Sequence, residues 1–167
     1  QSPVFGDRGI YTYAVYGGSN NEQRQNYWAK RRLNRESLPD RVGGARIWSN
    51  GRTVHTIGDL AGGMSQQENP CLSDEAVFET VLANALKWLS SDLKQADYIS
   101  ISQNDNMSVC GCANCKKVNT EEGSDSGTLV RFVNRIAEAI KEDYPDVLVH
   151  TLAYLATEAP PQMAKMQ

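Results

Sequence analysis

Hydrophobic residues recur every three or four positions in two long segments of the chain, which predicts two amphipathic helices. The first helix covers residues 73–95 and can be capped by Ser73. The second covers residues 126–144 and is ended by Pro145. The two apolar stripes consist of Val77, Val81, Leu82, Ala85, Leu89 and Leu93, and of Leu129, Phe132, Val133, Ile136, Ala137 and Ile140.

Runs rich in β-branched and aromatic residues predict strands that alternate with these helices. A thinner apolar stripe at residues 21–34 predicts one more helix, and residues 104–125 have the composition of a polar loop. The alternation indicates an α/β fold, with parallel strands and helices packed outside them. The predicted strands are 9–16, 98–102 and 147–155, with shorter candidates at 45–49 and 53–57.

The composition is that of a soluble globular protein with one core. The 167 residues predict a single α/β domain over 1–167, with 40% hydrophobic and 22% charged residues. The net charge of -3 argues against a nucleic-acid partner, because no basic stripe is present to meet phosphates. No apolar run reaches the roughly 18 residues that a membrane span needs, so we expect none.

Polar residues follow the strand predicted at 98–102, where α/β proteins place their ligands. Asn104 and Asp105 could bind a sugar, orient an amide or supply a general acid, although an Asx turn is the simpler interpretation. We expect Asp105 to be buried against the strand tips and protonated, as an acid catalyst requires. Glu122 is the second candidate, but only if its polar loop folds back over these tips.

Three further residues are candidates for substrate binding. His55 lies at the end of the strand candidate 53–57, although a lone histidine is more often a packing residue. Trp48 occupies a loop-facing position from which it could stack on a sugar ring. Tyr154 lies near the end of the strand 147–155. We expect Arg8, Asn104, Asp105 and Tyr154 to converge on one face of the sheet, because parallel strands end on the same side.

Four cysteines suggest a cross-link, and three interpretations stay open. Cys110, Cys112 and Cys115 have the spacing C-x-C-x-x-C, and with Cys71 they could bind one tetrahedral Zn²⁺. Disulfides in an exported protein are the second interpretation, in which Cys71 would pair with one of the other three. Reduced thiols in a buried loop are the third. A redox-active C-x-x-C is disfavoured, because such a motif opens a helix and here more loop is expected.

Several segments match a known family in order along the chain. The most specific part is the segment 102–127, with Ser102-Gln103-Asn104-Asp105-Asn106, Cys110-Gly111-Cys112-Ala113-Asn114-Cys115-Lys116 and 121–127, and the others are 7–11, 27–34, 54–56, 71–75, 132–134, 144–146 and 151–154. Together they resemble the domain-of-unknown-function 4838 family, which overlaps glycoside hydrolase family 163, a family of endo-β-N-acetylglucosaminidases. The resemblance covers nearly the whole chain.

The resemblance implies an exported (β/α)₈-barrel glycosidase that acts on N-glycans, whose location is secreted, periplasmic or at the cell surface. It implies retention of configuration through the substrate's own acetamido group, without a catalytic cofactor. Asn104 and Asp105 loosely match the pair that orients the acetamido group and protonates the leaving oxygen. Arg8 matches a sugar-binding arginine at the first strand.

Two departures from the family pattern qualify this expectation. A whole barrel needs about 250 residues, so we expect a partial barrel, from a fragment or a shortened form of the enzyme. The stretch from His55 to Cys71 is also shorter than the family pattern. Open sheet edges would permit self-association. The alternative function is a non-catalytic carbohydrate-binding or remnant domain with a structural cysteine or zinc cluster.

Overall fold

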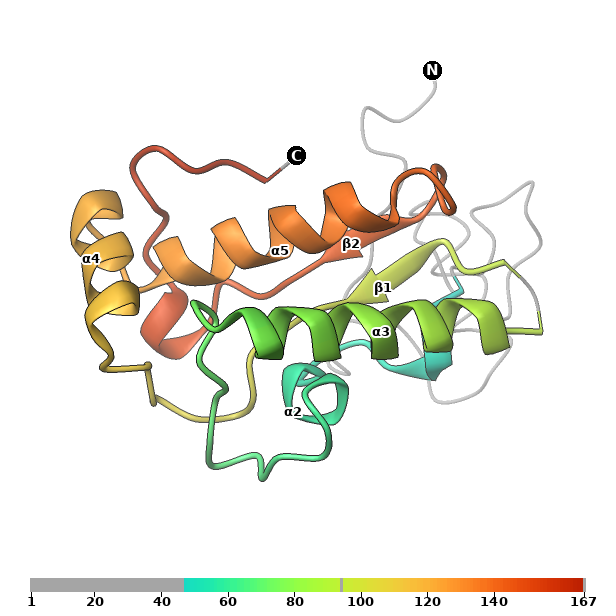
Figure 1. Ribbon diagram of the computed structural model, residues 1–167, viewed down its shortest axis with the longest axis horizontal. Helices are drawn as coiled ribbons and strands as arrows, with labels where there is room; N and C mark the ends of the chain where they lie inside the picture. Colours follow the sequence, from blue (N-terminus) through green and yellow to red (C-terminus); the bar gives the residue numbers. More distant parts are fainter. Residues whose placement is uncertain (1–46, 94, 167) are drawn as a thin grey trace, which may run out of the picture. The chain divides into compact units, whose positions relative to one another are not determined.

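The computed structural model describes residues 47–93 and 95–166, which form a mixed α/β arrangement (Figure 1). The predicted strand 9–16, the predicted helix 21–34 and Arg8 lie outside the described residues, so the prediction of one domain over 1–167 is not tested. The helices are α2 (Ile57–Leu60), α3 (Glu75–Ser91), α4 (Ala113–Glu122) and α5 (Ser126–Ile140), with 3-10 turns η3 (Ser49–Gly51) and η4 (Leu155–Thr157).

Two short strands form a parallel sheet. Strand β1 (Tyr98–Ser100) pairs with β2 (Leu148–His150), and Tyr98 lies opposite Leu148. On the other edge of β1, Trp48 makes an isolated parallel bridge to Tyr98. The parallel strand order predicted from the alternating elements is therefore confirmed for these strands.

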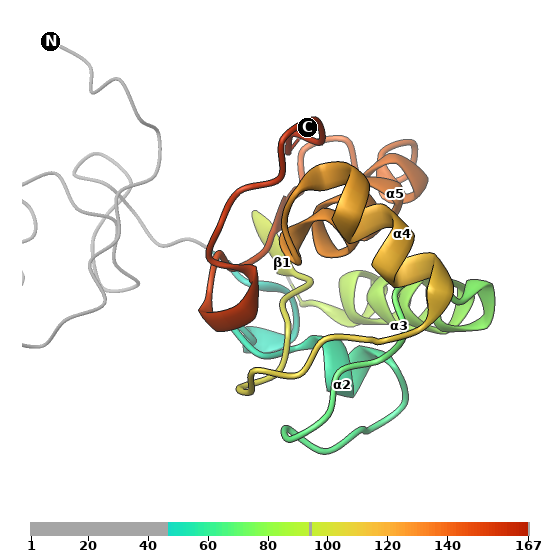
Figure 2. The same ribbon diagram turned by 90° about the vertical axis from the view of Figure 1, so that its left-hand side faces the viewer.

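Helices α3 and α5 pack side by side on the same face of this sheet (Figures 1 and 2). Asp74, not Ser73, caps α3: its carboxylate accepts a 3.0 Å hydrogen bond from the backbone N–H of Ala76. Both predicted helices are confirmed, although they end earlier than expected, at Ser91 and Ile140. Leu93, assigned to the first stripe, lies beyond the end of α3 and is fully exposed. The core between helices and sheet contains Val81, Ala85, Leu89, Ile99, Ile101, Phe132, Val133, Ile136 and Ile140.

The other face of β1 is also buried, but it is lined by hydroxyl groups. Ser100 and Ser102 have no exposed surface, and their hydroxyls lie 3.0 Å apart. Thr56 is equally buried and donates a 2.6 Å hydrogen bond to the carbonyl oxygen of Ser100. The central strand is thus covered on both sides, as is usual for parallel sheets.

One strand prediction and one loop prediction are wrong. Residues 53–57 form no strand, because the backbone N–H groups of Thr56 and Ile57 both bond to the carbonyl of Ser102 and the chain then turns into α2. The polar segment 104–125 contains the helix α4. Only Cys115 and Glu122 of α4 are buried, so this helix has no apolar stripe by which the sequence could reveal it.

The remaining differences concern lengths. The strand predicted at 147–155 is paired only over β2, and in the described part of the candidate at 45–49, residues 47–49, the pairing is the bridge at Trp48. Within the described part of the chain, no helix is both long and apolar enough to cross a membrane.

Candidate functional site

The segments that follow β1 and β2 meet at a hydrogen bond between side chains. The hydroxyl of Tyr154 donates to Oδ1 of Asp105 over 2.9 Å. This bond to a carboxylate raises the pKa of Tyr154, because losing the proton would place two negative charges together. The predicted convergence of Asp105 and Tyr154 at one end of the sheet is confirmed.

His55 joins this pair through the ring of Tyr154. The two ring centroids lie 5.7 Å apart, and Nδ1 of His55 lies 2.9 Å from the carbonyl oxygen of Gln103. A carbonyl oxygen only accepts, so Nδ1 carries a hydrogen, and in the neutral tautomer with that hydrogen Nε2 is an acceptor. Among the described residues, no group forms a hydrogen bond with Nε2. We call His55, Asp105 and Tyr154 the strand-tip cluster.

The backbone of His55 departs from the expected strand geometry. Its φ is 54°, which places this residue in the left-handed region that non-glycine residues seldom adopt. Such conformations persist only where surrounding contacts hold them, and they concentrate at functional sites. Here the Nδ1 bond to Gln103 and the contact with Tyr154 hold the ring.

Gln103 supports the strand-tip cluster through hydrogen bonds to Tyr154 and His55. The sequence pattern did not identify this residue. Its side chain is buried, its Nε2 donates a 2.7 Å hydrogen bond to the carbonyl of Tyr154, and its Oε1 accepts from the hydroxyl of Thr157. Its backbone carbonyl oxygen also accepts a hydrogen bond from Nδ1 of His55. Its place in the polar run after the strand was the available signal, but that run drew attention to Asn104 and Asp105 instead.

Asn104 is completely buried and holds a neighbouring loop. Its Nδ2 donates to the carbonyls of Ser65 and Glu68 over 3.1 and 2.7 Å, and its Oδ1 accepts from the N–H of Gly58 over 3.0 Å. The amide therefore bonds to protein backbone on both of its ends. A catalytic role for Asn104 stays a prediction.

Asp105 is exposed, so the expectation that it is buried against the strand tips is wrong. Asn104 fills the interior position at the strand tip, which leaves its neighbour on the surface. Trp48 stacks on Tyr98 with ring centroids 4.9 Å apart and meets His150 edge-on at 5.0 Å. One face of this indole is thus occupied within the protein, and its role in sugar binding stays a prediction.

The sequence suggested that Glu122 is in a flexible loop, but this residue lies at the end of α4 with 1% of its surface exposed. Its Oε2 accepts hydrogen bonds from the backbone N–H groups of Met163 and Ala164, at 2.8 and 3.0 Å, and its Oε1 meets Nη2 of Arg131 at 2.7 Å. These two N–H groups, followed by Arg131, hold the pKa of Glu122 below its usual value. In the described residues this carboxylate bonds only to protein groups.

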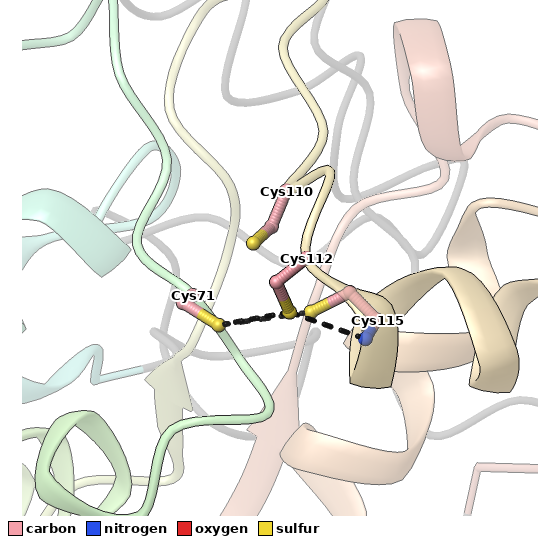
Figure 3. Close-up of side chains that lie close together, drawn as sticks. All are labelled: Cys71, Cys110, Cys112 and Cys115. Atoms are coloured by element: carbon pink, nitrogen blue, oxygen red, sulfur yellow. Dashed lines mark hydrogen bonds between the residues drawn. The ribbon is translucent and has the colours of Figure 1, made fainter.

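The four cysteines lie together at the start of α4 (Figure 3). All four sulfur atoms are within 4.8 Å of one another, and Cys71 Sγ lies 3.7 Å from Cys112 Sγ and 3.8 Å from Cys115 Sγ. All four are free thiols in the structure. The cluster predicted from the spacing is confirmed, and its geometry could bind a metal ion.

The C-x-x-C segment does open a helix, which corrects the expectation of more loop. Cys112 caps α4, and its sulfur accepts a 3.4 Å hydrogen bond from the N–H of Cys115. This bond lowers the pKa of Cys112 to about 7, whereas burial raises the pKa of Cys71 to about 12 and also raises that of Cys115. Because a metal ion binds thiolates, the helix start favours the charged form at one corner of the cluster.

A small cavity of about 50 Å³ lies beside the cysteines. Its wall includes Cys110 and Cys115, the loop residues Asn69 and Ser108, and Gln103 beneath the strand-tip cluster. A space of this size has room for a water molecule but not for a sugar ring. It therefore lies between the two candidate sites without being a substrate pocket itself.

Fold and sites together define an α/β protein with a polar cluster at the ends of parallel strands and a four-cysteine cluster. The chain belongs to the family described as "Domain of unknown function (DUF4838)", whose model matches residues 58–167. The match includes Asp105, Tyr154 and all four cysteines. Searches of curated proteins and of solved structures gave no match.

Proposed function

We propose that this chain contributes a glycan-binding site of an N-acetylglucosamine-specific glycoside hydrolase, and that its four cysteines bind a structural zinc ion. The observation that carries the first part is the 2.9 Å hydrogen bond between Tyr154 and Asp105, which brings together groups from two different strand ends. The family match supports it through the resemblance of that family to glycoside hydrolase family 163. In this proposal, β1 and β2 are neighbouring strands of a partial (β/α)₈ barrel.

The chemistry of the strand-tip cluster suits an acetamido sugar. An acetamido group offers one N–H donor, and the carboxylate of Asp105, held by the hydroxyl of Tyr154, offers an acceptor for that N–H. Nε2 of His55 adds an acceptor for a sugar hydroxyl. An aromatic ring such as that of Tyr154, with 37% of its surface exposed, can also lie against the apolar face of a sugar.

This arrangement changes the role we assign to Asp105. In substrate-assisted hydrolysis, the acetamido oxygen attacks the anomeric carbon while an acid protonates the leaving oxygen. An exposed carboxylate that already accepts a hydrogen bond from Tyr154 suits the orientation of the acetamido N–H. Proton donation then falls to another residue. Asn104 and Gln103 act as positioning residues. The side chain of Asn104 bonds to the backbone of the loop before α3, and that of Gln103 bonds to the backbone of Tyr154.

The cysteine geometry supports zinc as the metal. Zn–S bonds of about 2.3 Å in a tetrahedron separate neighbouring sulfur atoms by about 3.8 Å. Cys71 lies at 3.7 and 3.8 Å from two of its partners, before any adjustment to a metal. Four thiolates leave no open position on a tetrahedral ion, so the zinc would be structural and not catalytic.

Export and self-association complete the proposal. A secreted, periplasmic or cell-surface location follows from N-glycans as the substrate. Leu148 on β2 is 59% exposed, which suits contact with a further strand or a second copy. A Leu148→Lys variant that changes the sedimentation of the protein would support the second copy.

The function is tested by incubating the chain with high-mannose and complex N-glycoproteins and detecting released glycan by mass spectrometry. Because Asp105 would orient the acetamido group, we expect Asp105→Asn to reduce turnover by about a hundredfold or more, with folding intact. Asp146→Asn is the matched control, because Asp146 is exposed and lies before β2, at the opposite end from the cluster. Equal turnover by wild type and Asp105→Asn would refute the catalytic assignment.

Binding separates the enzyme from the non-catalytic alternative. Calorimetric titration with N,N′-diacetylchitobiose measures binding whether or not turnover occurs. Binding that Tyr154→Phe weakens, without release of glycan, would favour a carbohydrate-binding domain. Absence of both binding and turnover would overturn the glycan proposal.

A further inference from the structure

Two loops that are far apart in the sequence are joined by side-chain amides. We call them the paired loops: residues 65–70, before α3, and residues 104–109, after β1. Asn104 reaches across to the carbonyls of Ser65 and Glu68. In return, Oδ1 of Asn69 accepts a 2.9 Å hydrogen bond from the backbone N–H of Asn104. The strand tip is therefore bonded to the other loop through both its side chain and its backbone.

The bonds continue along the loops past Asp105. The backbone N–H of Asp105 donates to Oε1 of Gln66 over 3.3 Å, and Nδ2 of Asn106 donates to the carbonyl of Gln66 over 2.8 Å. Nδ2 of Asn69 bonds to Oδ1 of Asn106 and to the carbonyl of Ser108, each over 3.0 Å. The position of Asp105 thus depends on the loop 65–70.

Each of the paired loops runs directly into a cysteine. Cys71 follows the first loop and Cys110 follows the second. The cavity of about 50 Å³ lies beside these ends, and its wall includes Asn69, Pro70, Ser108 and Val109. A metal ion bound by the cysteines would join the two loop ends next to this cavity. Figure 3 shows Cys71 facing the three cysteines of the other segment.

We infer that a metal ion bound by the four cysteines closes the paired loops on one another and thereby positions Asp105 against Tyr154. Cys71 belongs to one side of this closure, and Cys110, Cys112 and Cys115 belong to the other. The metal then fixes the position of Asp105 without contacting it, because Gln66, Asn69 and Asn104 join the two loops by hydrogen bonds. This inference rests on the proposed metal site, but it adds a positioning role that a merely structural zinc does not require.

The test compares backbone hydrogen exchange in the zinc-loaded chain and in the chain stripped with a chelator. In the structure, the amides of Asn104, Asn106 and Ser108 all donate within the paired loops. We expect exchange in residues 104–109 to become at least tenfold faster after stripping. Exchange in α5 should not change, because its buried face lies in the core.

Two variants separate the steps of the inference. Cys71→Ser removes the ligand from one side and should increase exchange in residues 104–109 even with zinc present. Asn69→Ala leaves every thiol in place, so we expect one zinc ion per chain together with the faster exchange. The phenol absorbance of Tyr154 gives a second measurement, because its raised pKa should return toward 10 when Asp105 moves away.

The outcomes distinguish this inference from the metal proposal. Zinc bound at one ion per chain, with equal exchange in loaded and stripped protein, would overturn the positioning role and leave the structural zinc intact. Failure of the chain to bind zinc at all would overturn both. Faster exchange throughout α5 as well as in the paired loops would show general unfolding. It would also contradict a local effect of the metal on the paired loops.

Discussion

Arg131 and Glu122 form an ion pair in which the carboxylate is buried and the guanidinium is partly exposed. Nη2 of Arg131 lies 2.7 Å from Oε1 of Glu122, while the other carboxylate oxygen accepts from the backbone N–H groups of Met163 and Ala164. One side chain thereby ties α4, α5 and the segment after η4 together. The bonds to Arg131 and to the two backbone N–H groups stabilise the buried carboxylate of Glu122.

Glu122→Gln should destabilise the protein, because the neutral amide loses the charge-assisted bonds and points an N–H group toward donors. The pKa of Glu122 is lowered in the folded state, so its contribution is present above its ordinary value of 4.5 and is lost as the pH falls through the folded value. The difference in melting temperature between wild type and variant should thus be large at pH 7 and shrink below about pH 4.5.

Glu121→Gln is the matched control for this prediction. Glu121 is the neighbouring residue, it is exposed, and it lies 3.2 Å from Nη1 of the same Arg131. Exposed pairs contribute about 0–1 kcal/mol, so this variant should melt close to wild type. If thermal unfolding at pH 7 shifts equally in both variants, the burial of Glu122 is not what makes it important.

Asn104→Asp should destabilise the protein although it changes only the side-chain amide to a carboxylate. The carbonyls of Ser65 and Glu68 would then face an acceptor in place of the Nδ2 donor. The side chain of Asn104 is fully buried, and a buried polar group that loses its partners costs about 1–3 kcal/mol, so we expect about 2 kcal/mol less stability in urea unfolding.

This result would separate two roles for Asn104. A residue that only contacts substrate could become an aspartate without loss of stability. The variant Asn106→Asp offers the comparison, because Asn106 lies in the same loop at a half-buried position and should tolerate the charge better. Wild-type stability of Asn104→Asp would mean that the contacts with the loop 65–70 do not hold the strand tip.

The parts of the fold that the sequence predicted correctly are those in which apolar spacing decides the structure. The stripes of α3 and α5 and the strand containing Ile99 and Ile101 pack into the observed core. The meeting of Asp105 and Tyr154 followed from the rule that parallel strands end on the same side. Local pattern and general topology were sufficient for these features.

The sequence did not reveal α4, because its stability comes from its ends and not from an apolar face. Cys112 caps its start, and Gly123, with φ of 64°, ends it in the left-handed conformation. Gly123 after Glu122 was the signal that could have indicated a helix end. The burial of Glu122 could not be predicted at all, since it depends on Arg131 and on the segment 162–164, which are distant in sequence.

Gly127→Ala should destabilise the protein by about 1–3 kcal/mol, although alanine normally favours a helix. A Cβ at position 127 would lie 2.5 Å from Cβ of Glu122, so α4 and α5 would have to separate. Gly111→Ala is the control, because its Cβ would have only Cε of Lys116 nearby, at 3.8 Å. Chemical unfolding in which Gly127→Ala is as stable as Gly111→Ala would contradict this close helix contact.

The hydrogen bond between Tyr154 and Asp105 predicts one tyrosine that ionises at unusually high pH. The bond favours the neutral phenol, so the pKa of Tyr154 is raised above 10, first by the hydrogen bond and then by burial and by the charge of Asp105. A group whose pKa is raised on folding adds stability that is present below its unfolded value and lost as the pH rises through the folded value. The stabilising effect of Tyr154 is therefore expected below about pH 10 and should disappear above it.

Absorbance at the phenolate band checks this prediction against two variants. Tyr154→Phe should remove the late-titrating tyrosine, and Asp105→Asn should return it to the range of ordinary tyrosines, because the charge that opposes ionisation is gone. His55→Gln is the control that leaves the hydroxyl and the carboxylate in place, and it should preserve the high-pH step. If Asp105→Asn leaves that step unchanged, the hydroxyl of Tyr154 does not bond to Asp105 in solution, and the strand ends do not hold the carboxylate on which the proposed acetamido binding depends.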